Sequence, residues 1–268
     1  MVSIVTVCLN AALTIEDTIR SVAMQAASFQ VEHVIVDGGS RDSTREIIDR
    51  WVERCANIKK IYESDEGIFD AMNKGFRSAA GTYVLFLNSD DFLVTPDVLA
   101  RAMRCVTPDG KNPDLILGDV SMATLGQWGI WRHRRVPRLL GRLRGIGLFP
   151  VHQGLFIKRE LLSKSGGYPA RMRLAADVVH FYDVERKLQP SVVLLKSDVT
   201  FMRAGGAANA GIRAMCIGSL EIFHHLVKTH NAISAAAMVC VKTFQSLSEL
   251  RLGRCPHSRW FASDELSA

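Results

Sequence analysis

Short apolar runs rich in valine and isoleucine alternate with segments of helical spacing through the first 120 residues, and this alternation constrains the fold more than any other feature. Each run is nearly continuous in apolar character, which is typical of parallel strands covered by helices on both faces. Alternating strands and helices predict βαβ units. The predicted strands are residues 3–9, 33–37, 58–63, 83–87 and 115–120, and the predicted helices are residues 14–26, 43–55, 67–80 and 96–106.

Two of these helices carry sequence signals for their first turn. Ser43 and Glu46 have the spacing of a capping box, which predicts that the Ser43 side chain caps the second helix. Thr95 precedes Pro96, and a proline at the first helical position predicts that the fourth helix starts there.

The pattern loosens after residue 120 and then recovers. A strand is predicted at residues 153–157, followed by helices near residues 159–164 and 176–188. From residue 211 to residue 252 apolar side chains recur every three or four positions, which predicts two amphipathic helices. The chain therefore divides into residues 1–120, 121–205 and 206–268.

Composition narrows the class of protein. The chain has 268 residues, of which 48% are apolar and 22% charged, so one enlarged domain with a large core is expected and disorder is not. The six cysteines are far apart and form no Cys-x-x-Cys pair, which favours reduced thiols. The amino terminus lacks a basic lead and a long apolar run, so no signal peptide is predicted. The longest uncharged apolar stretch is about half of the ~20 residues that cross a membrane, and we expect a cytoplasmic protein.

The net charge of +6 is unevenly distributed along the chain. Six arginines and no acidic residues occur in the segment Arg132–Arg144, where leucines interleave with them. This segment suits anionic lipid headgroups or a lipid-pyrophosphate acceptor at the inner face of the cell membrane, and it suits a solvated basic face equally well. Nucleic acid is a poorer partner because no recognised binding motif accompanies the charge. The arginines are Arg132, Arg134, Arg135, Arg138, Arg142 and Arg144.

Polar and acidic residues follow four of the predicted strands directly. Because ligands of an open parallel sheet bind beyond the carboxyl ends of its strands, these residues are the first candidates for a binding site. Several carboxylates in one crevice repel each other unless a cation or ligand hydroxyls satisfy them, and oxygen ligands of this kind suit Mg²⁺ or Mn²⁺. An alternative for the last cluster is a turn and helix cap before Thr95. The candidates are Asn10, Asp37, Asp65, Asn88, Asp90 and Asp91.

Asp37 precedes two glycines, Gly38 and Gly39, ahead of a predicted helix. Glycines allow the backbone to approach a ligand closely, and the amino terminus of the helix is suited to a phosphate or ribose. A plain glycine-rich turn is the alternative. The chain contains no dinucleotide-binding G-x-G-x-x-G motif and no P-loop, so those two functions lose their main support.

Four ordered motifs, at residues 3–10, 34–44, 63–75 and 81–91, resemble family-2 glycosyltransferases of the GT-A fold, in the bacterial polysaccharide or colanic-acid-type branch. The resemblance implies an α/β fold with a doubly wound, mostly parallel sheet flanked by helices and a C-terminal helical extension. It assigns nucleotide-sugar binding to residues 1–120, acceptor binding and catalysis to residues 121–205, and amphipathic helices to the remainder.

The same resemblance implies an inverting sugar transfer from a nucleoside diphosphate sugar to a glycan or lipid-linked acceptor in bacterial surface polysaccharide synthesis. Asp37 and Asp65 would bind the nucleoside, and Asp90 and Asp91 would share the ribose and metal roles with Mn²⁺ or Mg²⁺. Asn73 and Lys74 would line the donor pocket, to which Asn10 and Asn88 also belong. Asn88 stands where the D-x-D pattern of the family has an acid, so one carboxylate of the expected metal site is missing.

A fainter resemblance continues at residues 152–153, 166–168, 174–177 and 201–206. It implies that Asp177 is the general base, and an inverting transfer does need a carboxylate to take the proton of the acceptor hydroxyl. The alternative for Asp177 is an acid placed at a helix start by the helix dipole. His152 would line the acceptor pocket or approach the metal, with a satisfied buried histidine as the alternative.

Two other functions remain open at the level of sequence. A catalytically inactive nucleotide-sugar-binding protein is compatible with Asn88 and with the valines after Asp177. A nucleotidyltransferase would share the nucleotide-binding layout, but the chain lacks a glycine-rich phosphate loop with a basic residue near its first strand.

Overall fold

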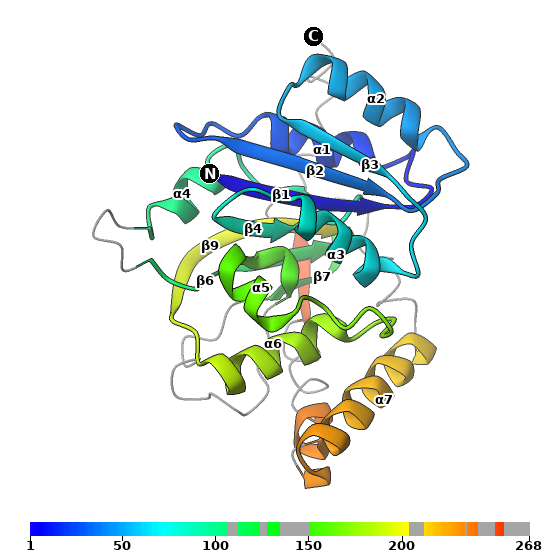
Figure 1. The fold of residues 1–268 in the computed structure, drawn as a ribbon, viewed down its shortest axis with the longest axis vertical. Helices are drawn as coiled ribbons and strands as arrows, with labels where there is room; N and C mark the ends of the chain where they lie inside the picture. The colour runs from blue at the N-terminus through cyan, green and yellow to red at the C-terminus, as the bar shows by residue number, and fades with distance from the viewer. Residues whose placement is uncertain are drawn as a thin grey trace.

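The computed structural model describes residues 1–106, 112–123, 128–134, 151–203, 212–233, 235–240 and 250–254. These residues form one large sheet with helices on both faces (Figure 1). The strands are β1 (Val2–Cys8), β2 (Val31–Asp37), β3 (Ile58–Tyr62), β4 (Tyr83–Phe86), β5 (Phe92–Leu93), β6 (Leu115–Ala123), β7 (Trp128–Arg134), β8 (Leu155–Lys158), β9 (Val192–Arg203) and β10 (Leu250–Arg254). The helices are α1 (Ile15–Ala23), α2 (Thr44–Arg54), α3 (Ile68–Ser78), α4 (Val98–Met103), the 3-10 turn η1 (His152–Gly154), α5 (Arg159–Ser165), α6 (Ala176–Leu188) and α7 (Ile212–Thr229).

The first four strands form a parallel half of the sheet, as the βαβ pattern predicts, and their order is β3-β2-β1-β4. Alternate side chains of β1 enter different cores. Val5 and Val7 pack with residues of α3 and α6, whereas Ile4 packs with residues of α4 on the opposite face. Apolar residues on both faces explain why the strand sequences are nearly continuous in apolar character.

Helix α3 packs against the sheet at very short range because Gly75 faces it. A Cβ atom at position 75 would lie 2.4 Å from Cγ1 of Val5 and 3.1 Å from Cγ2 of Val36. The glycine therefore allows the helix backbone to approach β1 and β2. This contact fixes α3 beside the carboxyl ends of the strands, where the polar loops begin.

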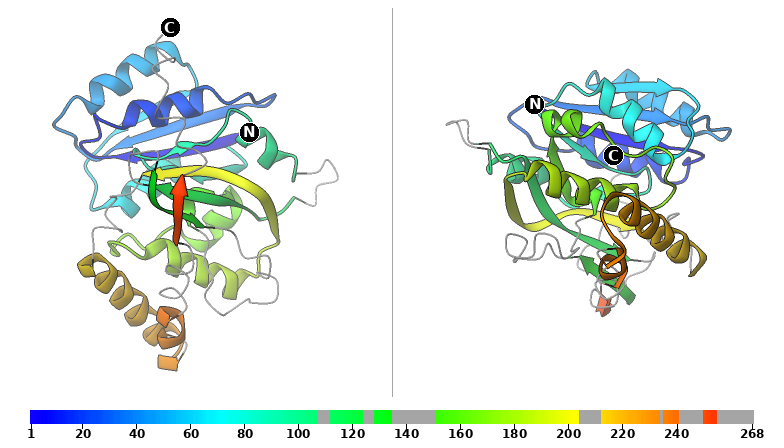
Figure 2. Two further views of the ribbon diagram at one scale, coloured as in Figure 1. Left: turned by 180° about the vertical axis from the view of Figure 1, so that it is seen from behind. Right: turned by 60° about the horizontal axis from the view of Figure 1, so that its bottom comes forward.

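The second half of the sheet is mixed. Strand β8 runs antiparallel between β4 and β6, so β4 and β6 point the same way without being neighbours. Among the ten described strands, seven run in one direction, and β5, β7 and β8 oppose them. The mostly parallel, helix-flanked sheet that we predicted is therefore confirmed. The long strand β9 pairs with β6 and curves around the sheet (Figure 2).

Helix α2 starts directly after Ser43, as predicted, but lacks the predicted side-chain cap, and α4 starts later than predicted. Ser43 makes no capping hydrogen bond at the start of α2; instead Asp42 Oδ1 accepts from the Thr44 backbone N–H at 3.1 Å. Helix α4 begins at Val98, two residues after Pro96, following a turn in which the Thr95 hydroxyl and the Asp97 carboxylate are 2.6 Å apart. At α2 an aspartate thus takes the place of the predicted serine as side-chain acceptor, whereas the N-cap residue of α4, Asp97, makes no side-chain cap.

The C-terminal segment contains the predicted first helix, α7, but it also contains a strand. Leu250 to Arg254 form β10, antiparallel to β7, so the prediction of helix up to residue 252 is wrong. Pairing with β7 satisfies backbone groups that a helix would satisfy internally, and the apolar spacing of the segment does not distinguish the two. Helix α7 packs on α6 and buries Ile222 and Leu226. Among the described helices, none combines the length and the apolar character needed to cross a membrane.

Candidate functional site

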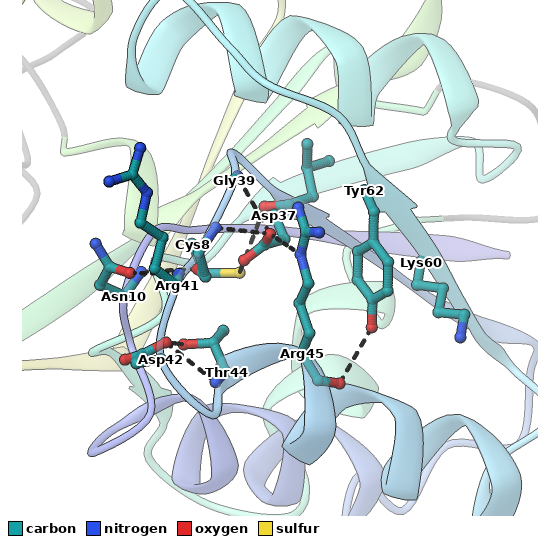
Figure 3. Close-up of polar contacts among 12 residues, drawn as sticks. Cys8, Asn10, Asp37, Gly39, Arg41, Asp42, Thr44, Arg45, Lys60 and Tyr62 are labelled. Carbon is teal, nitrogen blue, oxygen red and sulfur yellow. Dashed lines mark hydrogen bonds and ion pairs between the residues drawn. The ribbon is translucent and has the colours of Figure 1, made fainter.

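Asp37, at the end of β2, is buried in a network of hydrogen bonds (Figure 3). Its Oδ1 accepts from the backbone N–H groups of Gly39 at 3.2 Å and Ser40 at 3.0 Å, and from Nε of Arg45 at 2.6 Å. Burial acts to raise the pKa of Asp37, but the hydrogen bonds from Ser40, Arg45 and the backbone outweigh it and lower the pKa. Asp37 is therefore ionised and holds the loop that follows β2.

Arg45 was not among the predicted site residues. It lies in the first turn of α2, and its guanidinium is 4.8 Å from the centre of the Tyr62 ring at the end of β3 (Figure 3). The Tyr62 hydroxyl in turn donates to Asp49 at 2.6 Å. The arginine thus joins the ends of β2 and β3, and its only sequence signal is a basic residue in the helix that follows Asp37.

Asn10 occupies the left-handed region with φ of 52°, in the turn after β1. Its backbone N–H donates to Oγ of Ser40 at 2.7 Å, and its Oδ1 accepts from the Arg41 N–H at 2.8 Å. The loops after β1 and β2 therefore bind each other. The structure brings Asn10 and Asp37 to the same edge of the sheet, as predicted from their positions after two strands.

Asp65 follows β3 and lies against Gly38. A Cβ atom at Gly38 would be 2.0 Å from Oδ2 of Asp65, so only glycine leaves room for this carboxylate. Asp65 Oδ1 accepts from the Gly67 N–H at 2.9 Å. Burial, with Asp70 and Asp37 nearby, raises the pKa of Asp65 despite that hydrogen bond and the charge of Lys74. The two predicted nucleoside-binding acids, Asp37 and Asp65, thus lie close enough for the charge of one to act on the other.

Asn73 and Lys74 are both held by protein groups. The Asn73 amide donates to the Tyr168 carbonyl at 2.8 Å and accepts from the Tyr168 N–H at 2.9 Å, so it fixes the turn before Tyr168. Lys74 Nζ lies 2.5 Å from the Ser64 carbonyl and 3.0 Å from Glu63. The structure therefore gives these residues positioning contacts, and their predicted place in the donor pocket stays a prediction.

The two predicted metal ligands in the loop after β4, Asp90 and Asp91, have different surroundings. Asp91 is buried, and its carboxylate accepts from Nε2 of Gln153 at 3.1 Å and from the Arg203 backbone N–H. Burial, reinforced by Asp90, raises the pKa of Asp91 well above its ordinary value. Its carboxylate therefore supports the loop from within, which favours Asp90 over Asp91 as a metal ligand.

Asp90 lies at the edge of this loop, close to a second set of polar groups. Burial raises the pKa of Asp90, while the charges of Arg203 and His152 act to lower it. Asn88 Oδ1, on the same loop, is buried and has no hydrogen-bond partner among the described residues. A buried acceptor of this kind has lost water without gaining a donor, so it is suited to a cation or a ligand hydroxyl.

His152 and Asp177 form a pair across the site. Nδ1 of His152 lies 3.0 Å from Oδ2 of Asp177, which is in the first turn of α6, and both side chains are mostly buried. When the ring is neutral, its Nδ1–H donates to the carboxylate and Nε2 is left as an acceptor. Within the described residues, this Nε2 has no hydrogen-bond partner. The structure thus brings the predicted base to the predicted acceptor-side histidine.

Gln153 connects this pair to the loop after β4. It follows His152 in η1, donates to Asp91, and its backbone carbonyl accepts from the Thr200 hydroxyl at 2.6 Å. Our site prediction did not include Gln153. The polar Gln153 side chain is only 2% exposed and lies next to a candidate site residue. That burial is the signal that identifies it, and only the structure shows it.

Arg203, at the end of β9, is a third residue that our site prediction did not include, although it lies in the motif at residues 201–206. Its Nη1 donates to the Asp90 carbonyl at 3.2 Å, it pairs with Asp17, and its guanidinium lies 5.5 Å from the Phe92 ring centre. It therefore brings a positive charge to the loop that carries Asp90. Of the predicted Arg132–Arg144 surface, most residues and all arginine side chains lie outside the described residues.

The ligand atoms of the site fit a divalent cation in part. Asp90, Asn88 Oδ1 and His152 Nε2 offer oxygen and nitrogen atoms as metal ligands. The two neutral atoms, Asn88 Oδ1 and His152 Nε2, have no hydrogen-bond partner among the described residues. Within the same described residues, no group of three or more His, Cys, Asp or Glu side chains is placed to hold a metal. A metal here would therefore need the Asn88 amide or a ligand's own oxygens.

Comparison with known proteins identifies the family of the chain. Residues 3–167 match glycosyl transferase family 2, and the chain belongs to that family. It is 36% identical over 179 residues to a PGL/p-HBAD biosynthesis glycosyltransferase of Mycobacterium bovis, covering 66% of each chain. It is also 33% identical over 189 residues to an uncharacterized glycosyltransferase of Mycobacterium tuberculosis, covering 66% of this chain and 65% of that one. The chain thus spans slightly less than two thirds of these relatives.

Solved structures share the fold. Staphylococcus aureus TarS 1-349 in complex with UDP-GlcNAc has a TM-score of 0.62 at 18% identity, covering 92% of this chain and 72% of that chain. The mannosyltransferase PcManGT from Pyrobaculum calidifontis, in complex with GDP-Man and Mn²⁺, has a TM-score of 0.61 at 18% identity, covering 97% and 78%. The predicted GT-A fold is therefore confirmed.

Proposed function

We propose that the chain transfers one sugar, with inversion, from a nucleoside diphosphate sugar to a glycan or glycolipid acceptor. The contact that carries this proposal is the 3.0 Å pair between His152 Nδ1 and Asp177 Oδ2. It supports a carboxylate base held near the loop that carries Asp90, with Asp37 and Asp65 on the loops after β2 and β3. The family supports the reaction class, and TarS and PcManGT, which share the fold, were solved with nucleotide sugars.

Asp177 is the proposed general base. Its Oδ2 faces His152 and its Oδ1 accepts from the Val178 N–H at 2.8 Å, so the carboxylate has a defined orientation. A carboxylate oriented in this way takes the proton of the acceptor hydroxyl as that oxygen attacks the sugar. The departing nucleoside diphosphate stays on the side of Asp37 and Asp65, opposite the base.

Asp90 is the proposed protein anchor for Mn²⁺ or Mg²⁺, with the Asn88 amide as a further ligand. The ion would supply neutralisation of negative charge on the leaving diphosphate. Arg203 adds a permanent positive charge beside Asp90. This charge would help to neutralise the leaving diphosphate, a role that a more weakly held ion fills less well when the acid at position 88 is missing.

The experiment that tests the proposal combines binding and turnover. Calorimetry with a panel of nucleoside diphosphate sugars in Mn²⁺ or Mg²⁺ should detect one donor, and released nucleoside diphosphate should report transfer or slow hydrolysis. Asp177→Asn should abolish transfer and leave donor affinity within about twofold, since the amide keeps the shape but accepts no proton. If donor binds and the wild-type chain never turns it over, the chain is an inactive binding protein.

A second reading of Asp177 is separable in the same experiment. A histidine that binds a metal usually donates its other ring N–H to a carboxylate, and loss of that carboxylate weakens the metal by about 10- to 100-fold. If Asp177→Asn weakens Mn²⁺ binding by that factor, Asp177 orients His152 and is not the base. Unchanged Mn²⁺ affinity with lost transfer supports the base.

The acceptor proposal includes a surface polysaccharide role and contact with the inner face of the cell membrane through Arg132–Arg144. Its support is the charge pattern of that segment. Vesicles with anionic lipid should recover more protein than neutral vesicles at low salt. Equal recovery would remove the electrostatic form of this proposal.

A further inference from the structure

Glu221 on α7 binds three consecutive backbone N–H groups of another segment. Its Oε1 accepts from Arg173 at 2.7 Å, and its Oε2 accepts from Leu174 and Ala175, each at 3.0 Å. These residues are 46 to 48 positions away in the sequence, so the contact is tertiary. A charged acceptor makes such hydrogen bonds stronger than a neutral one does.

The segment that Glu221 binds leads directly into α6. Ala175 is the N-cap residue of that helix, and it provides no side-chain cap. The amino terminus of a helix has unsatisfied N–H groups and a positive partial charge, which a carboxylate stabilises. Of these groups Glu221 accepts from the Ala175 N–H, and its other two hydrogen bonds hold the two residues directly before the helix end.

Asp177 is the second residue of α6, so the position of the helix start determines where its carboxylate lies. Ala175 and Ala176 are fully buried, and they belong to the same core as Ile222 and Leu226 of α7. Glu221 precedes Ile222 directly, so its backbone is anchored by a buried neighbour. The start of α6 is therefore held on one side by packing and on the other by the Glu221 carboxylate.

We infer that Glu221 is a positioning residue for sugar transfer: it fixes the start of α6 so that Asp177 meets His152. The inference rests on the proposed role of Asp177. Loss of the carboxylate leaves three N–H groups without their acceptor and allows the start of α6 to shift. A shift of about 1 Å at a reacting group costs up to roughly a hundredfold in rate.

The test uses Glu221→Gln and Glu221→Ala in the full chain, with Glu160→Gln as the matched control. Glu160 is an exposed residue of α5 that pairs with Lys164, and it receives the same chemical change. We expect kcat to fall by roughly tenfold to a hundredfold in Glu221→Ala. In Glu221→Gln we expect kcat to fall less, because the amide oxygen still accepts from one or two of the N–H groups. The donor KM should stay within about twofold in both, since Asp37 and Asp65 are untouched.

Measurements that do not depend on sugar transfer test this inference separately from the proposed function. Ring resonances of His152 in NMR spectra at one pH, and hydrogen exchange of the Leu174 and Ala175 amides, report the site directly. In both Glu221 variants we expect shifted His152 resonances and faster exchange, and in Glu160→Gln neither. If the wild-type chain transfers no sugar, the proposed function fails, while these spectra still decide whether Glu221 positions the pair.

The inference is overturned by His152 resonances that stay at their wild-type positions in both Glu221 variants. It is also overturned if the thermal midpoint falls but kcat does not, because Glu221 would then act on stability alone. If Glu221→Ala does not fold, Glu221→Gln carries the test, since it retains the size of the side chain.

Discussion

Nε2 of Gln153 donates to Oδ2 of Asp91 at 3.1 Å, and both residues are almost completely buried. This bond joins η1, which begins with His152, to the loop that carries Asp90. It therefore couples the acceptor side of the site to the proposed metal side. The stability of the chain and the geometry of the site depend on the same contact.

Replacing Gln153 with Ala should lower the free energy of unfolding by about 1–3 kcal/mol, because a buried carboxyl group loses a donor. Urea unfolding followed by circular dichroism measures this change. The control is Asn57→Ala, since the Asn57 amide donates to the Val31 carbonyl at an exposed position. Equal small losses in the two variants would show that the Gln153 bond adds nothing to stability.

Asn73→Ala should be destabilising by a similar amount, about 1–3 kcal/mol, because the N–H and carbonyl of Tyr168 both lose their partner. Donor affinity distinguishes positioning from direct binding. If Asn73 only holds the turn before Tyr168, donor affinity measured well below the thermal midpoint stays within about twofold of wild type. A loss of more than tenfold in a folded variant would place the amide in the donor pocket.

Acid should destabilise the chain through its buried histidines. Burial lowers the pKa of His180 to about 4 and that of His33 to about 3, from an ordinary value of 6.5. Below pH 6.5 the unfolded chain binds a proton that the folded histidine refuses, so stability is complete above pH 6.5 and falls as the pH falls towards 4. Each such histidine contributes a slope of up to about 1.4 kcal/mol per pH unit.

His180→Gln checks this slope. The free energy of unfolding, measured by urea between pH 4 and 6.5, should depend less steeply on pH than in wild type by about one proton. The matched control is Ser165→Ala, which removes the 2.7 Å contact between the Ser165 hydroxyl and His180 Nε2 but keeps the ring. Parallel curves for wild type and His180→Gln would mean that His180 is protonated in the folded chain.

Asn88→Asp should strengthen divalent metal binding, because it adds a carboxylate to the loop that carries Asp90. We expect Mn²⁺ affinity in the presence of a nucleoside diphosphate to rise about tenfold, measured by calorimetry. Asn57→Asp makes the same change at an exposed site and should have no effect. An unchanged affinity in Asn88→Asp would show that position 88 lies outside the metal site.

The sequence alone determined the parallel half of the sheet and the location of its polar loops. Val5, Val34 and Leu85 lie in strands that were predicted within about two residues, because a strand buried on both faces must be apolar throughout. Asn10, Asp37 and Asp65 then lie at one edge of the sheet, since parallel neighbours end at the same edge.

The tertiary structure decided the contacts that complete the site. Asn73 and Tyr168 are 95 residues apart, Gln153 and Asp91 are 62 apart, and Glu221 reaches the start of α6 from a helix that the sequence marks only as amphipathic. The sequence does not show which backbone N–H groups will donate a hydrogen bond to a side chain. A polar side chain is recognised as a hydrogen-bond partner only when burial has removed its water. For the same reason the insertion of β8 between β4 and β6 could not be predicted, because strand neighbours depend on the whole sheet.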